Sequence, residues 1–272
     1  MEDAHNLESS VTANRNTEAA YSPNNPPWGG WAAFGVWVAS ILFIVVFQNL
    51  FLAPYVFASK VPLNDPNAIL EFSKTDPIAV LLTFVSVIPA HIFTFVLAWL
   101  VVTRFRRFSF REMLGWEWGG FKVWHAVALS VLFYLIALGA VQIFGDVEND
   151  LDRMLRSSWY IKYVVAVIAI LSAPLVEEVV YRGVLYSAFQ RAFGVVIAVV
   201  AVTLLFSLVH VAQYSQNATP DYAVMSVLTL LSLLLTLVRV WTGNLLPCIV
   251  LHLVFNSFQS VVMIAEPYLS AQ

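Results

Sequence analysis

Long apolar runs separated by short polar segments make up most of this chain. Several of the runs exceed the roughly 18 residues that cross a hydrocarbon core about 30 Å thick. They are continuous rather than alternating, which favours helices over the strands of a membrane barrel. The pattern therefore predicts an all-α fold, a polytopic transmembrane helical bundle of about seven spans (seven to eight). The runs lie near residues 31–53, 78–103, 122–144, 159–190, 194–213, 222–241 and 244–265.

Composition excludes several classes of protein. Of the 272 residues 60% are hydrophobic and 11% are charged, whereas soluble domains carry roughly 25% charged residues. A net charge of −3 leaves no basic surface for nucleic acid, so no nucleic-acid partner is expected. The single cysteine, Cys248, cannot form an internal disulfide or a thiolate metal site by itself.

The N-terminal 27 residues differ from the rest of the chain. They are polar and contain Pro23, Pro26 and Pro27, and no basic segment leads into an apolar stretch as in a signal peptide. We therefore expect a disordered polar tail over residues 1–27. Residues 28–272 are expected to form one transmembrane domain, since no internal repeat is visible.

Loop charges predict the orientation of the spans. Basic residues gather in the second connection, at Arg104, Arg106, Arg107, Arg111 and Lys122. The first and third connections are acidic. Because cytoplasmic loops carry the excess of Lys and Arg, we expect a multi-pass protein with a cytoplasmic N-terminus. Its membrane would be the plasma (inner) membrane in a bacterium or the endoplasmic reticulum in a eukaryote.

The fourth span carries charges where they are costly. A charged side chain at the middle of a span costs on the order of 2.5–3.5 kcal/mol. Glu178 and Arg182, four residues apart, share a helix face and can pair. Glu177 points roughly 100° away, which leaves its carboxylate available for chemistry. In the alternative interpretation Arg182 ends the span at the interface and both glutamates line a solvated helix terminus.

Two later spans carry polar side chains at one-turn spacing. Phe206 and His210 share a face of the fifth span, and His252 and Asn256 share a face of the seventh. A lone histidine in a helix is commonly a packing residue. Asn256 could equally join neighbouring helices, where such hydrogen bonds contribute about 0.6–2 kcal/mol. Neither pair alone identifies a site.

Taken in order, the segments EEVVYR, FSLVH and HLVFN resemble the CPBP (CAAX protease and bacteriocin-processing, or Abi) intramembrane proteases. This family includes the type II CAAX prenyl endopeptidases and reads Glu-Glu-x-x-x-Arg, Phe-x-x-x-His and His-x-x-x-Asn on separate helices. The resemblance covers about residues 160–260. It implies a conical intramembrane cavity and a peptidase.

The resemblance also implies roles for individual residues. Glu177 would activate the hydrolytic water and His210 would help to hold it. His252 and Asn256 would stabilise the oxyanion. The supporting residues would be Glu178, Arg182 and Phe206. These residue types supply a base for water and donors for the tetrahedral oxygen, which peptide hydrolysis needs.

The sequence is compatible with a metal-dependent site and with a metal-free site. Glu177, His210 and His252 could form a His₂Glu set with one position left for water, as in several zinc hydrolases. The sequence has no HExxH segment, and glutamate catalysis without a metal is the other possibility for this family. The cofactor is thus one divalent metal such as zinc, or none.

The leading hypothesis is a glutamate-dependent intramembrane endopeptidase that hydrolyses a peptide bond of a membrane-associated protein or peptide, prenylated or not. The first alternative is a non-catalytic membrane scaffold or regulator with the same fold. The second is a proton-coupled transporter that uses the same carboxylates and histidines as a relay.

The positions of Glu177 and His210 along their spans make one difficulty for the protease hypothesis. Straight and untilted helices would place the two residues at different depths in the membrane, separated by roughly 10–15 Å. A tilted or displaced fourth helix would bring them to the same depth.

Overall fold

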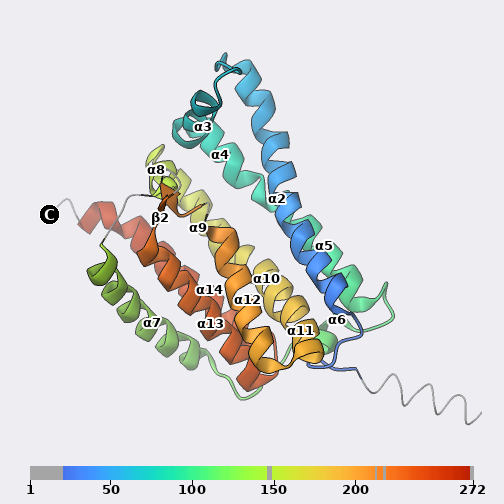
Figure 1. The fold of residues 1–272 in the computed structure, drawn as a ribbon. Coiled ribbons are helices and arrows are strands. Elements are labelled where there is room, and N and C mark those ends of the chain that lie inside the picture. Colours follow the sequence, from blue (N-terminus) through green and yellow to red (C-terminus); the bar gives the residue numbers. More distant parts are fainter. Residues whose placement is uncertain (1–20, 146–148, 212, 217–218, 270–272) are drawn as a thin grey trace, which may run out of the picture.

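The computed structural model describes residues 21–145, 149–211, 213–216 and 219–269, and this part of the chain is almost entirely helical (Figure 1). A short antiparallel pair of strands, β1 (Ser215–Gln216) and β2 (Thr219–Pro220), interrupts the helices. The helices in chain order are α2 (Gly30–Ala58), α3 (Pro66–Thr75), α4 (Pro77–Val85), α5 (Val87–Thr103), α6 (Phe110–Leu114), α7 (Val123–Phe144), α8 (Asp150–Arg156), α9 (Ile161–Leu171), α10 (Ala173–Glu178), η1 (Val179–Leu185), α11 (Tyr186–Phe193), α12 (Val195–His210), α13 (Tyr222–Thr242) and α14 (Leu246–Leu269).

The helix lengths confirm a bundle of about seven spans. Within the described residues, 6 helical segments are long and apolar enough to cross a membrane. The fifth predicted span is the apolar helix α12, which has 16 residues. At 1.5 Å per residue it rises only about 24 Å, less than a typical hydrocarbon core. His210 is its last residue, so the helix ends three residues before the end of the predicted span.

The fourth span lies at the centre of the bundle. Helix α2 and the α4–α5 segment lie on one side of it, and α7, α13 and α14 lie on the other (Figure 1). The segment η1 contacts α2, α5, α6, α12 and α13. One hydrophobic core surrounds η1, and a second joins α7, α13 and α14. Side chains of the fourth span therefore meet side chains from distant parts of the sequence.

The fourth span is not one regular helix. It is interrupted at Ser172, between α9 and α10. Pro174 follows in the first turn of α10, where its lack of a backbone N–H is tolerated. It then continues as η1, a π-helix of 7 residues that are all buried. π-Helical turns are rare and often occur at functional sites. Glu177 and Glu178 sit at the junction between α10 and this π-helix.

Acidic residues in the connections have local roles as helix caps. Asp65 and Asp76 accept backbone N–H groups at the starts of α3 and α4, and Asp221 does so at α13. Two ion pairs join α3 to α8, Lys74 with Asp150 at 2.6 Å and Arg153 with Glu71 at 2.5 Å. These acidic residues thus have structural roles, and the orientation inferred from the loop charges stays a prediction.

The boundary of the predicted tail needs a correction. Residues 1–20 lie outside the described residues, but residues 21–27 pack against the bundle and are followed by the buried Trp28. We call Tyr21–Trp28 the N-terminal strap. Its backbone carbonyls accept hydrogen bonds from three arginines, which explains why this polar segment is ordered. The donors are Arg104, Arg191 and Arg239.

Candidate active site

A buried ion pair forms the base of the site. Arg182 Nη1 donates to Glu178 Oε1 at 2.9 Å, and both side chains are 0% exposed. The other guanidinium N–H groups donate to α13, from Nη2 to the Ser232 carbonyl at 2.7 Å and from Nε to the Thr236 hydroxyl at 3.2 Å. A planar guanidinium can hold several such partners at once. The alternative interpretation, with Arg182 at the interface, is therefore wrong.

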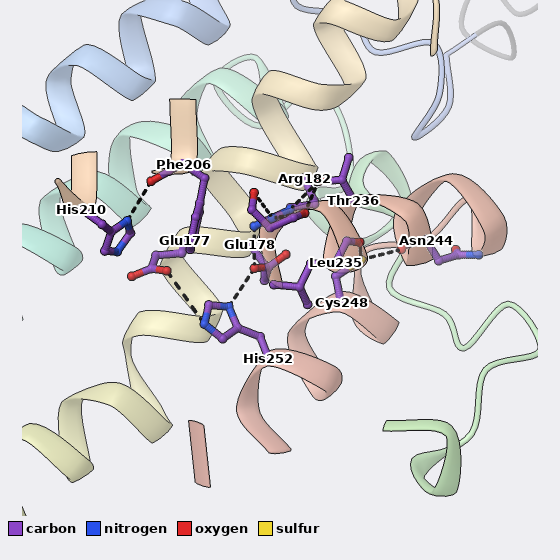
Figure 2. A network of polar contacts seen from close by, with 11 residues as sticks. Glu177, Glu178, Arg182, Phe206, His210, Leu235, Thr236, Asn244, Cys248 and His252 are labelled. Atoms are coloured by element: carbon purple, nitrogen blue, oxygen red, sulfur yellow. Dashed lines mark hydrogen bonds and ion pairs between the residues drawn. The ribbon is translucent and has the colours of Figure 1, made fainter. Parts of the chain in front are cut away.

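The seventh span adds His252 to this pair. His252 Nδ1 donates to Glu178 Oε1 at 2.8 Å, so the same carboxylate oxygen receives both Arg182 and His252 (Figure 2). A hydrogen bond on one ring nitrogen fixes the role of the other. His252 Nε2 consequently faces Glu177, with 4.0 Å between Nε2 and Glu177 Oε2.

The gap between His252 and Glu177 has the right size for one bridging water molecule. A distance of 4.0 Å is too long for a direct hydrogen bond, and one water molecule can touch both groups across it. The two adjacent glutamates differ in environment, because the Glu177 side chain is 23% exposed and the Glu178 side chain is 0% exposed. Glu178 is thus enclosed by cationic or protonated partners, whereas Glu177 is accessible.

Phe206 connects the fifth span to the cluster. Its ring centroid lies 4.7 Å from that of His210, 5.0 Å from that of Tyr181 and 6.4 Å from that of His252. The Arg182 guanidinium carbon lies 5.0 Å from the same ring. Both histidines therefore lie near one aromatic ring, which brings the fifth and seventh spans together at the cluster.

His210 is oriented by its own helix. His210 Nδ1 donates to the Phe206 carbonyl at 2.8 Å, which leaves Nε2 for other partners. In Figure 2 the His210 ring and the Glu177 carboxylate lie toward the same edge of the cluster. Tyr214 follows one turn later, with its ring centroid 6.4 Å from that of His210. Loss of water around the phenol, with a further contribution from the Glu177 charge, raises the pKa of Tyr214 to about 12, so it stays protonated at neutral pH.

Asn256 lies in the same helix as His252 but makes a different contact. Its Nδ2 donates to the Ala169 carbonyl at 2.8 Å, which joins α14 to α9. This contact matches the helix-joining interpretation of the sequence. The role of Asn256 at the oxyanion remains a prediction.

We expect Asn256→Ala to act mainly through that helix contact. Loss of one interhelical hydrogen bond should lower the free energy of unfolding by about 0.6–2 kcal/mol and lower kcat less than about tenfold. Removal of a true oxyanion donor costs roughly 10²–10³ in kcat. Steady-state cleavage rates and unfolding in mixed micelles measure the two quantities. The matched control is Ser257→Ala, since the Ser257 hydroxyl donates within its own helix, to the Leu253 carbonyl. A hundredfold loss of kcat in the Asn256 variant alone would show the oxyanion role.

Several residues of the cluster were not identified from the sequence. Ser232 and Thr236 of α13 hold Arg182, and their spacing of four residues within an apolar span was a usable signal. Tyr181 accepts a hydrogen bond from Trp37 Nε1 at 3.2 Å, and no pattern in the sequence indicated this pair. His91 is hydrogen-bonded to Ser172 at 3.1 Å, at the break in the fourth span.

The predicted metal ligands do not form a metal site in this arrangement. Among the described residues, no group of three or more His, Cys, Asp and Glu side chains is placed to hold a metal ion. His210 and His252 each donate from Nδ1 to a protein oxygen, which leaves Nε2 as the atom that a ligating histidine would present to a metal. A divalent metal at this site stays a prediction, and the chemistry proposed below uses the side chains alone. Cys248 is fully buried and its thiol donates to the Leu235 carbonyl, which makes it unsuitable as a nucleophile.

These features define an integral, multi-pass helical membrane protein with a buried acid–base cluster between its fourth, fifth and seventh spans. Residues 158–258 match the family described as type II CAAX prenyl endopeptidase Rce1-like. This region of the chain is thus similar to the Rce1-like family, in agreement with the resemblance of its polar segments. No curated protein and no solved structure matches the chain. All of the predicted site residues lie inside the matched region, whereas the N-terminal strap and the first three spans lie outside it.

Proposed function

We propose that this protein is an intramembrane endopeptidase in which Glu177 activates a water molecule to hydrolyse a peptide bond. The observation that carries the proposal is the gap of 4.0 Å between Glu177 Oε2 and His252 Nε2. Behind that gap, His252 is held by Glu178, and Glu178 is held by Arg182. An accessible carboxylate therefore faces Nε2 of an oriented histidine, which is a donor when both ring nitrogens carry a proton. The two side chains supply the base and the donor that the reaction needs.

The reaction follows from this arrangement. Glu177 takes a proton from the water, and the water oxygen forms a bond to the substrate carbonyl carbon. Protonated His252 donates from Nε2 to the developing oxyanion, where a preorganised donor has its largest effect. The C–N bond then breaks, and Glu177 delivers its proton to the leaving nitrogen. His210, with Nδ1 engaged by Phe206, helps to hold the water through Nε2.

Glu178 and Arg182 act as positioning residues in this scheme. Because the carboxylate of Glu178 is completely buried, it depends on Arg182 for compensation of its charge. Its hydrogen bond to His252 Nδ1 sets the ring orientation, as a carboxylate does in other catalytic triads. Phe206 fixes the spacing between the two histidines by contact with both rings.

The substrate follows from the place of the site. Glu177 and His252 lie in spans of the bundle, so a substrate must approach from the bilayer or its surface. We infer a membrane-associated protein or peptide, cut within or beside the membrane. Prenylation of that substrate is a proposal drawn from the family description, and a cytoplasmic N-terminus is a proposal drawn from the loop charges.

The test is cleavage by the purified full chain in liposomes, against a library of membrane-tethered peptides with and without a prenyl group. Mass spectrometry of the products locates the scissile bond. We expect cleavage near the membrane that is insensitive to thiol and serine reagents. Well-folded protein that cuts no peptide in the library would overturn the proposal and favour the scaffold. Proton-coupled uptake in the same liposomes would instead favour the transporter.

A further inference from the structure

One tryptophan of the N-terminal strap contacts the π-helix η1. Trp28 is 3% exposed, and its Nε1 donates to the Val184 carbonyl of η1 at 3.0 Å. A π-helix departs from the regular i→i+4 hydrogen-bond ladder, and Trp28 gives this segment a donor from outside the helix. Val184 lies two residues after Arg182 on the same buried segment. The contact therefore bears directly on the segment that carries Arg182 and that directly follows Glu178.

Two arginine side chains fix the strap at Trp28 and at the residues before it. Arg191 donates from Nη2 to the Trp28 carbonyl at 2.9 Å and from Nη1 to the Pro26 carbonyl. Arg239, which is 0% exposed, donates to the Pro23 carbonyl and to Asn24 Oδ1, both at 2.9 Å. Each arginine thus has partners on the strap that a disordered tail would not provide.

Arg239 also links the strap to the end of the fourth span. Its Nη2 donates to Ser187 Oγ at 3.3 Å, and its guanidinium carbon lies 5.3 Å from the ring centroid of Tyr186. Both residues belong to α11, directly after η1. The strap is therefore connected to the π-helix at Val184 and to the helix that follows it.

A second tryptophan outside the family match acts on the same segment. Trp37 Nε1 donates to the Tyr181 hydroxyl at 3.2 Å, and the Tyr181 ring packs against Phe206. Two indole N–H groups from the first part of the chain therefore end on η1. The matched domain at residues 158–258 contains neither of them.

We propose that Trp28, held in place by the strap, is a positioning residue of the site that acts through η1 on Glu178 and Arg182. This inference rests on the proposed function for its catalytic consequence. A shift of η1 would move Glu178 relative to His252, and misplacement of a catalytic group by about 1 Å can cost on the order of 10²-fold in rate. The strap thereby makes the family domain depend on a segment outside it.

The experiment compares Trp28→Phe with Trp31→Phe in the full chain in lipid nanodiscs. The first substitution retains an aromatic ring and removes the N–H donor, whereas Trp31 is 90% exposed and serves as the matched control. Hydrogen exchange is followed in peptides that cover residues 179–185. We expect exchange there to rise roughly three- to thirtyfold in the Trp28 variant, the effect of one lost buried hydrogen bond, and to stay unchanged in the control.

Measurements of kcat and KM distinguish a positioning role of Trp28 from a general effect on stability. With the same peptide substrate, we expect kcat of the Trp28 variant to fall at least about fivefold with KM within about twofold of the wild-type value. Unchanged exchange at residues 179–185, an equal rise across all helices, or an unaltered kcat would each overturn the inference. If the wild-type protein cleaves no peptide, the proposed function fails, and the exchange data still decide whether Trp28 holds η1.

Discussion

Replacement of Glu177 by Gln should lower kcat for peptide cleavage by about 10²–10⁴-fold, which is the usual contribution of a general base. Glutamine has nearly the same shape but cannot take the proton from water. Glu177 is partly exposed, and its contact with His252 is 4.0 Å long. The free energy of unfolding should therefore change by less than about 0.5 kcal/mol, as for substitutions away from packed features.

The control for this prediction is Glu117→Gln, which removes an exposed carboxylate far from the fourth span in sequence. Single-turnover cleavage in liposomes measures the chemical step, and unfolding in mixed micelles measures stability. We expect the control to cleave like the wild type. Full activity in the Glu177 variant would assign the base to another group and contradict the mechanism.

Replacement of Arg182 by Met should lower the free energy of unfolding by about 3–5 kcal/mol, because removal of one partner leaves a buried charge uncompensated. Glu178 is 0% exposed, and its Oε2 has no hydrogen-bond partner among the described residues. Among the described residues, Arg182 and, when it is protonated, His252 are the cationic side chains that form ion pairs with Glu178. Cleavage should be lost together with stability.

The matched experiment is the double variant Arg182→Met with Glu178→Gln. Replacement of both members of a buried pair is often close to neutral for stability, so the double variant should recover most of the lost stability. Thr236 does not oppose this recovery, since its hydroxyl already donates to the Ser232 carbonyl. The Ser232 hydroxyl loses Arg182 in the single and the double variant alike, so it does not affect the comparison between them. Activity should not return, because His252 loses the carboxylate that orients it. Equal stability of the single and double variants would contradict a coupled pair.

Local spacing in the sequence predicted much of the fold and part of the site. The length and apolarity of the runs predicted the bundle, because backbone groups in lipid must be satisfied within helices. Glu178 and Arg182 were predicted to pair because they are four residues apart in one span, and they do. The three polar segments also predicted the family that the comparison found. Each of these inferences depends on contacts within one helix or on the cost of exposing polar groups to lipid.

Only the tertiary structure decided which helices share their polar groups. Glu178 and His252 are separated by 74 positions, and Trp28 and Val184 by 156, so no local spacing could pair them. All residues of the π-helix that carries Arg182 are buried by side chains of other helices. Asn256 had equally good local reasons to face the site or a neighbouring helix, and packing of α14 against α9 directed it to Ala169. The sequence by itself therefore determined the spans and the chemical groups, whereas packing between distant segments determined the partner of each group.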